Sequence, residues 1–324
     1  MQGVEKKSLR DTYGAILAEL GEKNPNVVVL DADLSSSTRT AIFASKFPDR
    51  FFNMGVAEQD MISTAAGLAA AGKIPFASTF AIFASGRAWE QVRQSVCLSN
   101  LNVKIAASHG GITVGEDGPS HQALEDIALM RVLPNMTVIV PCDANETAAA
   151  TRKIADTYGP VYLRTSREKF PLITGKDDEF HIGRGRILRH GPDVAIIACG
   201  VMTGKALSAA KLLEAEGVSA AVVNMPTIKP IDEDLIIQMA MTTGAIVTAE
   251  EHSITGGLGS AVAEVVCENE PVPVIRVGMK GKFGSSGKPD ELLDYYGMSA
   301  ASIVEAAHKA IALKNEPARN PRAR

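Results

Sequence analysis

The chain has 324 residues, 46% hydrophobic and 22% charged, which is typical of a globular protein with room for two domains. A formal net charge of −4 provides no basic field for nucleic acid or an anionic membrane. The four cysteines are far apart and form no C-x-x-C pair, which argues against a zinc site or a disulfide framework. No secretory signal is visible, and no apolar run reaches the roughly 18 residues of a membrane span, so we expect a cytoplasmic protein without membrane or nucleic-acid partners.

Apolar runs of strand length alternate with helical stretches over residues 1–170, which predicts a first α/β domain. Because these strands are continuous apolar runs, we expect a mostly parallel sheet covered by helices on both faces. The expected strands are residues 27–30, 74–78, 103–107, 137–140 and 161–163. The expected helices are residues 9–20, 57–71, 87–99 and 146–158, the last of them capped by Asp143.

Residues 171–185 interrupt this alternation with Pro171, Gly175, a KDDE run and Gly183, so we interpret them as a linker. The alternation resumes over residues 186–313, which predicts a second, smaller α/β domain of the same mostly parallel kind. Its GGLGSA turn lacks the downstream acid of a dinucleotide fingerprint and is better explained by close helix packing. The polar, Pro-interrupted tail of residues 314–324 is expected to be disordered.

Polar residues interrupt apolar surroundings at two places in the first domain. The helix expected from residue 57 is almost wholly small or apolar, yet it opens with Glu58, either a terminal cap favoured by the helix dipole or a buried functional acid. The Gly-rich stretch SHGGITVGEDGPSHQ follows an expected strand and contains His109, Asp117 and His121. Such a loop at the carboxyl edge of a parallel sheet lies where α/β proteins bind ligands.

The motifs FFNMGVAEQDM, GLAAAGKIPFASTFAIF and GEDGPSHQ, in this order, resemble the pyrimidine-binding domain of transketolases. VYLRTSRE and the second half of the chain resemble the rest of the C-terminal section of that family, so the resemblance covers residues 5–313. It implies a thiamine diphosphate enzyme in which Glu58 is hydrogen-bonded to the aminopyrimidine, its burial favouring the protonated form. Phe80 and Phe83 would line this ring, although their spacing also suits core packing, and Asp33 would lie near the cofactor or serve only in a turn.

The resemblance also implies sugar-binding residues in the Gly-rich loop. His109, Asp117 and His121 match residues that contact the hydroxyls of the sugar substrate. Imidazole can donate to a ketose oxygen and relay protons near pH 7, so His109 and His121 are candidate catalytic residues as well.

Arg10, Ser37 and Arg167 match the clamp of the family on the sugar phosphate. A guanidinium group binds phosphate oxygens in pairs and a hydroxyl donates a further bond, although an arginine is ordinarily a surface residue. Arg87 and Arg164 are less specific candidates for the same clamp.

The diphosphate site expected of such an enzyme is missing. The family holds the diphosphate through a divalent ion with a G-D-G motif, and no G-D-G occurs in this chain. The resemblance therefore implies a split transketolase, in which a separate N-terminal subunit holds Mg²⁺ or a similar ion and this chain provides no metal ligand. We expect a heterotetramer with two copies of each chain, which transfers a two-carbon ketol unit from a ketose phosphate to an aldose phosphate.

Three other interpretations remain open on sequence alone. A deoxyxylulose-phosphate synthase shares G-x-A-E-Q and D-G-P-x-H, but it typically has an acid at the position of His109. The β subunit of a 2-oxo-acid dehydrogenase has a similar layout but lacks the E-D-G-P-S-H loop. A non-catalytic regulatory or binding subunit would not need a competent residue at every expected catalytic position, as this chain has.

Overall fold

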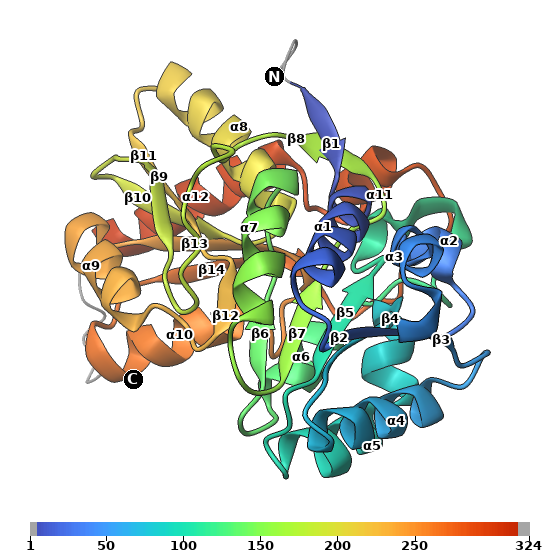
Figure 1. Cartoon of the computed structure of the whole chain (residues 1–324). Coiled ribbons are helices and arrows are strands. Elements are labelled where there is room, and N and C mark those ends of the chain that lie inside the picture. Colours follow the sequence, from blue (N-terminus) through green and yellow to red (C-terminus); the bar gives the residue numbers. More distant parts are fainter. Residues whose placement is uncertain (1–4, 317–324) are drawn as a thin grey trace.

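The computed structural model describes residues 5–316, and its first domain is built on a seven-stranded sheet (Figure 1). The strand order is β12-β6-β7-β5-β4-β2-β3, and all neighbours are parallel except β12 and β6. The strands are β2 (Val27–Asp31), β3 (Phe51–Asn53), β4 (Ile74–Phe80), β5 (Lys104–Ser108), β6 (Thr137–Ile139), β7 (Val161–Arg164) and β12 (Thr227–Lys229). Strands of this buried kind are the continuous apolar runs expected from the sequence.

Helices cover both faces of this sheet because its strands direct apolar side chains alternately to each face. In β2, Val27 and Val29 pack against one set of helices, whereas Leu30 packs against the opposite set. The first set is α1 (Leu9–Lys23), α3 (Ala41–Lys46) and α7 (Ala144–Ala155), and the second includes α4 (Glu58–Ala70) and α6 (Asp126–Arg131). As predicted, Asp143 caps α7, accepting a hydrogen bond from the Glu146 N–H at 2.8 Å.

The prediction of a regular α-helix over residues 87–99 is wrong, because most of this segment is π-helical. The chain there forms two π-helical segments, η2 (Phe83–Arg87) and η3 (Val92–Cys97), separated by the short helix α5 (Trp89–Gln91). The apolar spacing gives no sign of this widening, because the same buried face is kept by Ala84, Ala88 and Val92. Such π segments are frequent at functional sites.

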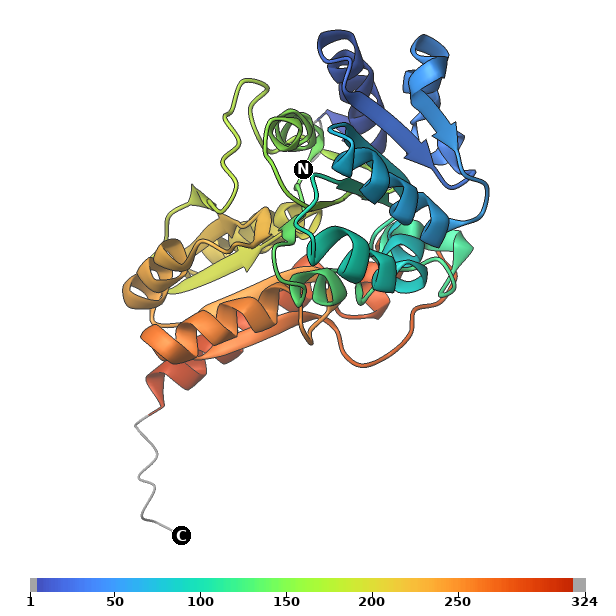
Figure 2. The same ribbon diagram turned by 60° about the horizontal axis from the view of Figure 1, so that its bottom comes forward.

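The second domain is a five-stranded sheet in the order β14-β13-β10-β11-β9, in which only β9 is antiparallel. Its strands are β9 (Arg186–Arg189), β10 (Val194–Ala198), β11 (Ala220–Asn224), β13 (Ile246–Ser253) and β14 (Val274–Met279). Its helices are α8 (Met202–Ala215), α9 (Glu233–Thr243), α10 (Leu258–Asn269), α11 (Pro289–Tyr295) and α12 (Ala300–Asn315). Two mostly parallel sheets flanked by helices confirm the predicted α/β fold (Figure 2).

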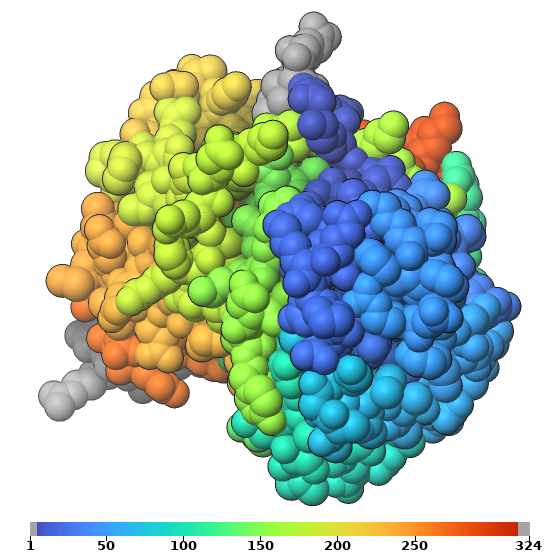
Figure 3. Space-filling view, viewed as in Figure 1, coloured from blue at the N-terminus to red at the C-terminus, as the bar shows by residue number. Residues whose placement is uncertain are grey.

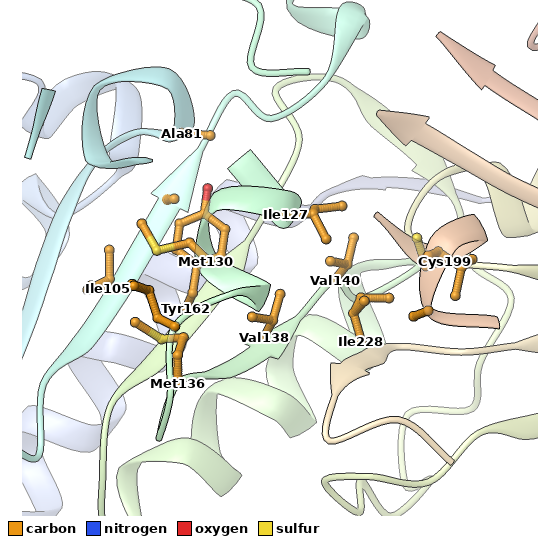
Figure 4. Packing of buried hydrophobic residues seen from close by; sticks show 14 of the residues in the cluster. Ala81, Ile105, Ile127, Met130, Met136, Val138, Val140, Tyr162, Cys199 and Ile228 are labelled. Atoms are coloured by element: carbon orange, nitrogen blue, oxygen red, sulfur yellow. The ribbon is translucent and has the colours of Figure 1, made fainter. Parts of the chain in front are cut away.

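One of the hydrophobic clusters is shared by the two domains. A single buried cluster extends from Ala81, Ile105 and Tyr162 of the first domain to Cys199 of the second and to Ile228 of β12 (Figure 4). Strand β12 comes from the second half of the chain yet pairs with β6 of the first sheet, with Thr227 opposite Ile139. The sequence does not predict that a strand from the second half of the chain joins the first sheet.

The segment interpreted as a linker lies on the outer face of the molecule (yellow-green in Figure 3) and is held by Asp143. The second oxygen of this carboxylate accepts hydrogen bonds from the Ile173 N–H at 2.5 Å and the Thr174 N–H at 2.7 Å. Just before it, β8 (Lys169–Pro171) pairs with β1 (Lys6–Ser8) in a two-stranded ribbon.

The end of the chain differs from the expectation at two residues. Helix α12 continues to Asn315, so residues 314 and 315 are helical and not part of a disordered tail. Residues 317–324 of the expected tail lie outside the described part of the chain. Within residues 5–316, no helix has the length and apolar character needed to cross a membrane.

Candidate functional site

The candidate site lies where parallel strands of the first sheet end at one edge. Strand β4 ends at Phe80, β5 ends one residue before His109, and β7 ends three residues before Arg167. Because β4, β5 and β7 are neighbours in the same direction, these residues meet at the carboxyl edge of the sheet, where α/β folds bind ligands.

Glu58 is the first residue of α4 and is 1% exposed. Both of its carboxylate oxygens accept hydrogen bonds from Nη1 of Arg87, each at 2.9 Å. Within residues 5–316 these oxygens receive no bond from a backbone amide, so capping does not explain the burial of this acid. The half-exposed guanidinium group of Arg87 thus balances the charge of the buried carboxylate.

Aromatic rings form a continuous wall beside this carboxylate. The Phe80 ring stacks on His109 with centroids 3.8 Å apart and lies 5.9 Å from Phe83 in a nearly parallel arrangement. His121 meets Phe83 edge-on at 5.5 Å, and the Arg87 guanidinium lies over Phe83 at 4.7 Å from the ring centroid. The structure therefore brings together five of the residues singled out in the sequence: Glu58, Phe80, Phe83, His109 and His121.

His109 is held in an unusual backbone conformation and in a positive environment. Its φ is 60°, which is uncommon for a residue other than glycine, and its side chain is 2% exposed. The Ser108 hydroxyl lies 2.9 Å from Nδ1, which leaves Nε2 as the ring atom that can meet a ligand. Burial, followed by the charges of Arg10, Arg167 and His121, lowers the pKa of His109 to about 3.

We therefore expect His109 to stay neutral from pH 8 to pH 5. Because the lowered pKa favours the uncharged ring, its Cε1–H resonance should not shift between pH 8 and 5, whereas a histidine with the ordinary pKa of about 6.5 would titrate fully. The resonance is assigned by its loss in His109→Asn, and the denatured chain provides the control. A midpoint near 6.5 in the folded chain would contradict the buried, positive surroundings.

The arginines expected to bind phosphate lie at the same edge of the sheet. Arg10 Nη1 donates to the backbone carbonyl of Ser37 at 3.0 Å, and its buried Nε has no hydrogen-bond partner within the described residues. Arg167 Nη1 donates to the carbonyl of Val114 at 2.7 Å and to Asp117 at 3.1 Å. The contribution of Ser37 is through its carbonyl, whereas the sequence suggested its hydroxyl.

The electrostatics of Arg10 link it to Arg167. Burial, and then repulsion from Arg39 and Arg167, lower the pKa of Arg10. Two guanidinium groups close enough to repel each other favour an anion that binds between them. Such a pair of guanidinium groups can bind the oxygens of a phosphate group.

Two other candidates occupy different surroundings. Arg164 is 5% exposed and donates through Nε to Asp126 at 2.7 Å and through Nη2 to the Glu251 carbonyl at 3.0 Å. It therefore belongs to the packing between the domains and is not free to bind phosphate. Asp33 is exposed at a φ of 61° and accepts from the Asn53 side chain at 3.1 Å. This contact fits a turn, and none of the described interactions joins Asp33 to the aromatic wall.

Two contacts near the candidate site are not evident from the sequence. Arg87, a candidate phosphate ligand by resemblance, pairs instead with Glu58. The buried Asp31 accepts hydrogen bonds from the Leu34 N–H and from the hydroxyls of Thr38 and Thr40, and so shapes the segment that contains Ser37. Its position at the end of a predicted strand was the available signal. Among residues 5–316 no three His, Cys, Asp or Glu side chains gather in a metal-binding cluster.

Family models match both domains of the chain. Residues 5–172 match the pyrimidine-binding domain of transketolase, and residues 183–303 match the transketolase C-terminal domain. The transketolase C-terminal section of Methanocaldococcus jannaschii is 54% identical over 92% of this chain and 95% of its own length. The 6-deoxy-6-sulfo-D-fructose transketolase subunit SqwH of Clostridium sp. is 45% identical, over 96% of this chain and 97% of its own length.

Solved structures give the same relationship. A chain described as a split gene transketolase, inactive β4 tetramer, is 56% identical and superimposes with a TM-score of 0.89 over 95% of this chain and 99% of its own. Transketolase of Pichia stipitis in complex with sedoheptulose 7-phosphate has a TM-score of 0.80 at 26% identity, over 96% of this chain and 46% of that chain. The chain therefore belongs to the transketolase family of transferases, as a C-terminal section of the split-gene kind.

Proposed function

We propose that this chain binds the aminopyrimidine of thiamine diphosphate, the general cofactor of the family, and the sugar phosphate of a ketol transfer. The supporting observation is the convergence of an acid, an aromatic wall and two histidines at one sheet edge, beside a pair of arginines. The cofactor ligands would be Glu58, Phe80 and Phe83, with Asp33 as the weakest candidate. The substrate ligands would be Arg10, Ser37, His109, Asp117, His121 and Arg167.

The residues present fit an aminopyrimidine. The Glu58 carboxylate already accepts N–H donors from a planar, nitrogen-rich group, the Arg87 guanidinium, which also lies over the Phe83 ring. An aminopyrimidine is likewise planar and presents N–H donors, so it could replace Arg87 at the carboxylate. Since the Arg87 side chain is 47% exposed, it can move into solvent, and a proton shared between Glu58 and a ring nitrogen of the aminopyrimidine would then take the place of the ion pair.

The cofactor, when bound, supplies the electron sink for cleavage and formation of the carbon–carbon bond. The residues of this chain bind and orient the reactants around it. His109, kept neutral, presents Nε2 to a sugar oxygen, and His121 contacts a neighbouring hydroxyl and moves a proton there. Arg10 and Arg167 bind the phosphate at the far end and fix the position of the carbonyl end.

The proposal requires a partner subunit. The chain contains no G-D-G motif and spans about half of the mammalian transketolases that it matches, 49% in the case of the human enzyme. A separate N-terminal chain would provide Mg²⁺ or a similar divalent ion and the diphosphate site, in a cytoplasmic heterotetramer with two copies of each chain. The description of the related β4 tetramer as inactive supports this division of the site.

Reconstitution tests the proposal. The purified chain should show no ketol transfer and no tight binding of thiamine diphosphate, and addition of a G-D-G-containing partner should restore both. Turnover is measured with a ketose phosphate donor and an aldose phosphate acceptor, and cofactor binding by calorimetry. The donor panel includes 6-deoxy-6-sulfo-D-fructose, because one relative is named for it and its sulfonate is an anion that the arginines could bind. Full activity of the chain alone would refute the divided site.

The same assay separates the other enzyme classes considered from the sequence. Activity on pyruvate in place of the ketose phosphate would favour a deoxyxylulose-phosphate synthase or a 2-oxo-acid dehydrogenase. The matches to transketolase sections over both domains do not favour either.

A further inference from the structure

The loop with the proposed substrate ligands rests on the second domain. Between β5 and α6 it contains the 3-10 segment η4 (Ile112–Asp117) and two glycines, Gly115 and Gly118, at φ of 82° and 75°. Backbone bonds within the first domain hold the start of this loop and its later turn, among them Gly110 to Thr165, Gly111 to Ala123, and His121 to Gly118. Its middle has no strand neighbour, so its position depends on other contacts.

The second domain supplies these contacts at two places. Glu251, near the end of β13, accepts the Thr113 N–H at 2.5 Å, and a methyl group on Gly111 would lie 2.2 Å from its carboxyl carbon. The segment before α11 meets the other side of the loop, where Gln122 Nε2 donates to the Ser285 carbonyl at 2.9 Å. The loop is therefore held against two segments that belong to the other domain.

Burial of the Glu251 carboxylate lowers the stability of the fold. Its side chain is 3% exposed, and one of its oxygens, Oε2, has no hydrogen-bond partner within the described residues. Burial raises the pKa of Glu251, although the charge of Arg164 and the bond from Thr113 oppose this rise. A carboxylate in such surroundings costs stability unless a specific contact requires it.

The contact with Thr113 leads directly to the phosphate site. The next residue along the chain, Val114, presents its carbonyl to Nη1 of Arg167 at 2.7 Å. The same guanidinium nitrogen also meets Asp117, the last residue of η4. A shift of the loop at Thr113 would therefore move the acceptors that orient Arg167.

We infer that Glu251 of the second domain is a positioning residue, which fixes the loop of residues 110–118 through the Thr113 N–H and thereby orients Arg167. This inference rests on the proposed function in one respect, namely that the loop and Arg167 bind the substrate. It gives the second domain a part in substrate binding.

The test compares Glu251→Leu and Glu251→Gln with Glu250→Gln in the full chain. Glu250 is equally buried on the same strand, but it accepts from the Leu258 and Gly259 amides at the start of α10 and does not contact the loop. The measurement is hydrogen–deuterium exchange of the Thr113 amide. Because a hydrogen bond to a charged group is lost, exchange should be about tenfold or more faster in Glu251→Leu. It should be intermediate in Glu251→Gln, whose amide oxygen is a weaker acceptor, and unchanged in Glu250→Gln.

A kinetic measurement on the reconstituted complex separates positioning from general destabilisation. Glu251→Leu should raise the KM for a phosphorylated donor by about tenfold and leave kcat within about twofold, with most of the KM restored in Glu251→Gln. Unchanged exchange at Thr113 in both Glu251 variants, or equal acceleration in Glu250→Gln, would overturn the inference; if Glu251→Leu does not fold, Glu251→Gln decides. Should the complex show no ketol transfer at all, the proposed function fails, and the exchange experiment still decides whether Glu251 holds the loop.

Discussion

Replacement of Glu58 by Gln should reduce turnover of the reconstituted enzyme by at least about 100-fold, the range lost with a group that shares or transfers a proton in the reaction. The carboxylate accepts two N–H bonds at 2.9 Å in the present structure, and both of its oxygens are available to planar N–H donors. An amide keeps the shape but offers one acceptor oxygen and no exchangeable carboxyl proton. Turnover is measured with saturating cofactor and partner subunit.

The fold should survive this substitution. Arg87 is 47% exposed and can be solvated when its partner loses the charge, so the melting temperature should stay close to that of the unmodified chain. Asp60→Asn is the matched control, because Asp60 lies in the same first turn of α4 but is exposed. Turnover equal to wild type in Glu58→Gln would remove this acid from the cofactor site.

Replacement of Arg167 by Gln should raise the KM for a phosphorylated donor by about 10- to 100-fold, since a charge-assisted bond to phosphate contributes about 1.5–3 kcal/mol. The KM for the same ketose without phosphate should change by no more than about twofold. The difference arises because Arg167 is only 28% exposed and is oriented by Val114 and Asp117 toward the edge shared with Arg10.

Arg152→Gln provides the control for this effect. It removes the same charge from α7, where Arg152 pairs with Glu19 in an ion pair that does not involve the candidate site. Both KM values should remain at the wild-type level in that variant. Equal increases for the phosphorylated and unphosphorylated donors in Arg167→Gln would show that Arg167 acts on the sugar or on the loop and not on the phosphate.

The sequence predicts the sheets well because their strands are buried on both sides. Residues 27–30 and 161–163 were expected as strands, and the structure extends each by a single residue, Asp31 and Arg164. The Gly-rich loop that contains His109 could be located for the same reason, since it follows such a strand, whereas Phe80 is identified only through the resemblance to transketolases. A residue that directly follows a buried parallel strand lies at the carboxyl edge of the sheet, so its position there can be predicted from the local sequence.

Contacts between distant segments could not be predicted in this way. The pairing of Arg87 with Glu58 spans 29 positions, and that of Glu251 with Thr113 spans 138. Strand β12 has three residues, too few for a periodic pattern, and its partner lies almost ninety positions earlier. Each of these contacts depends on how helices and strands pack against one another in the folded chain. A short stretch of sequence contains no information about that packing.

Strand β12 also limits how chains of this kind can recombine. Thr227 and Lys229 pair with the edge of β6, and the Lys229 ammonium donates to the carbonyls of Arg131 and Leu133 at 2.9 and 2.5 Å. A crossover between two related genes at residues 171–185 would therefore join a β6 edge from one parent to a β12 strand from the other. A chimaera joined there keeps this packing only where the β12 residues of one parent fit the β6 edge of the other.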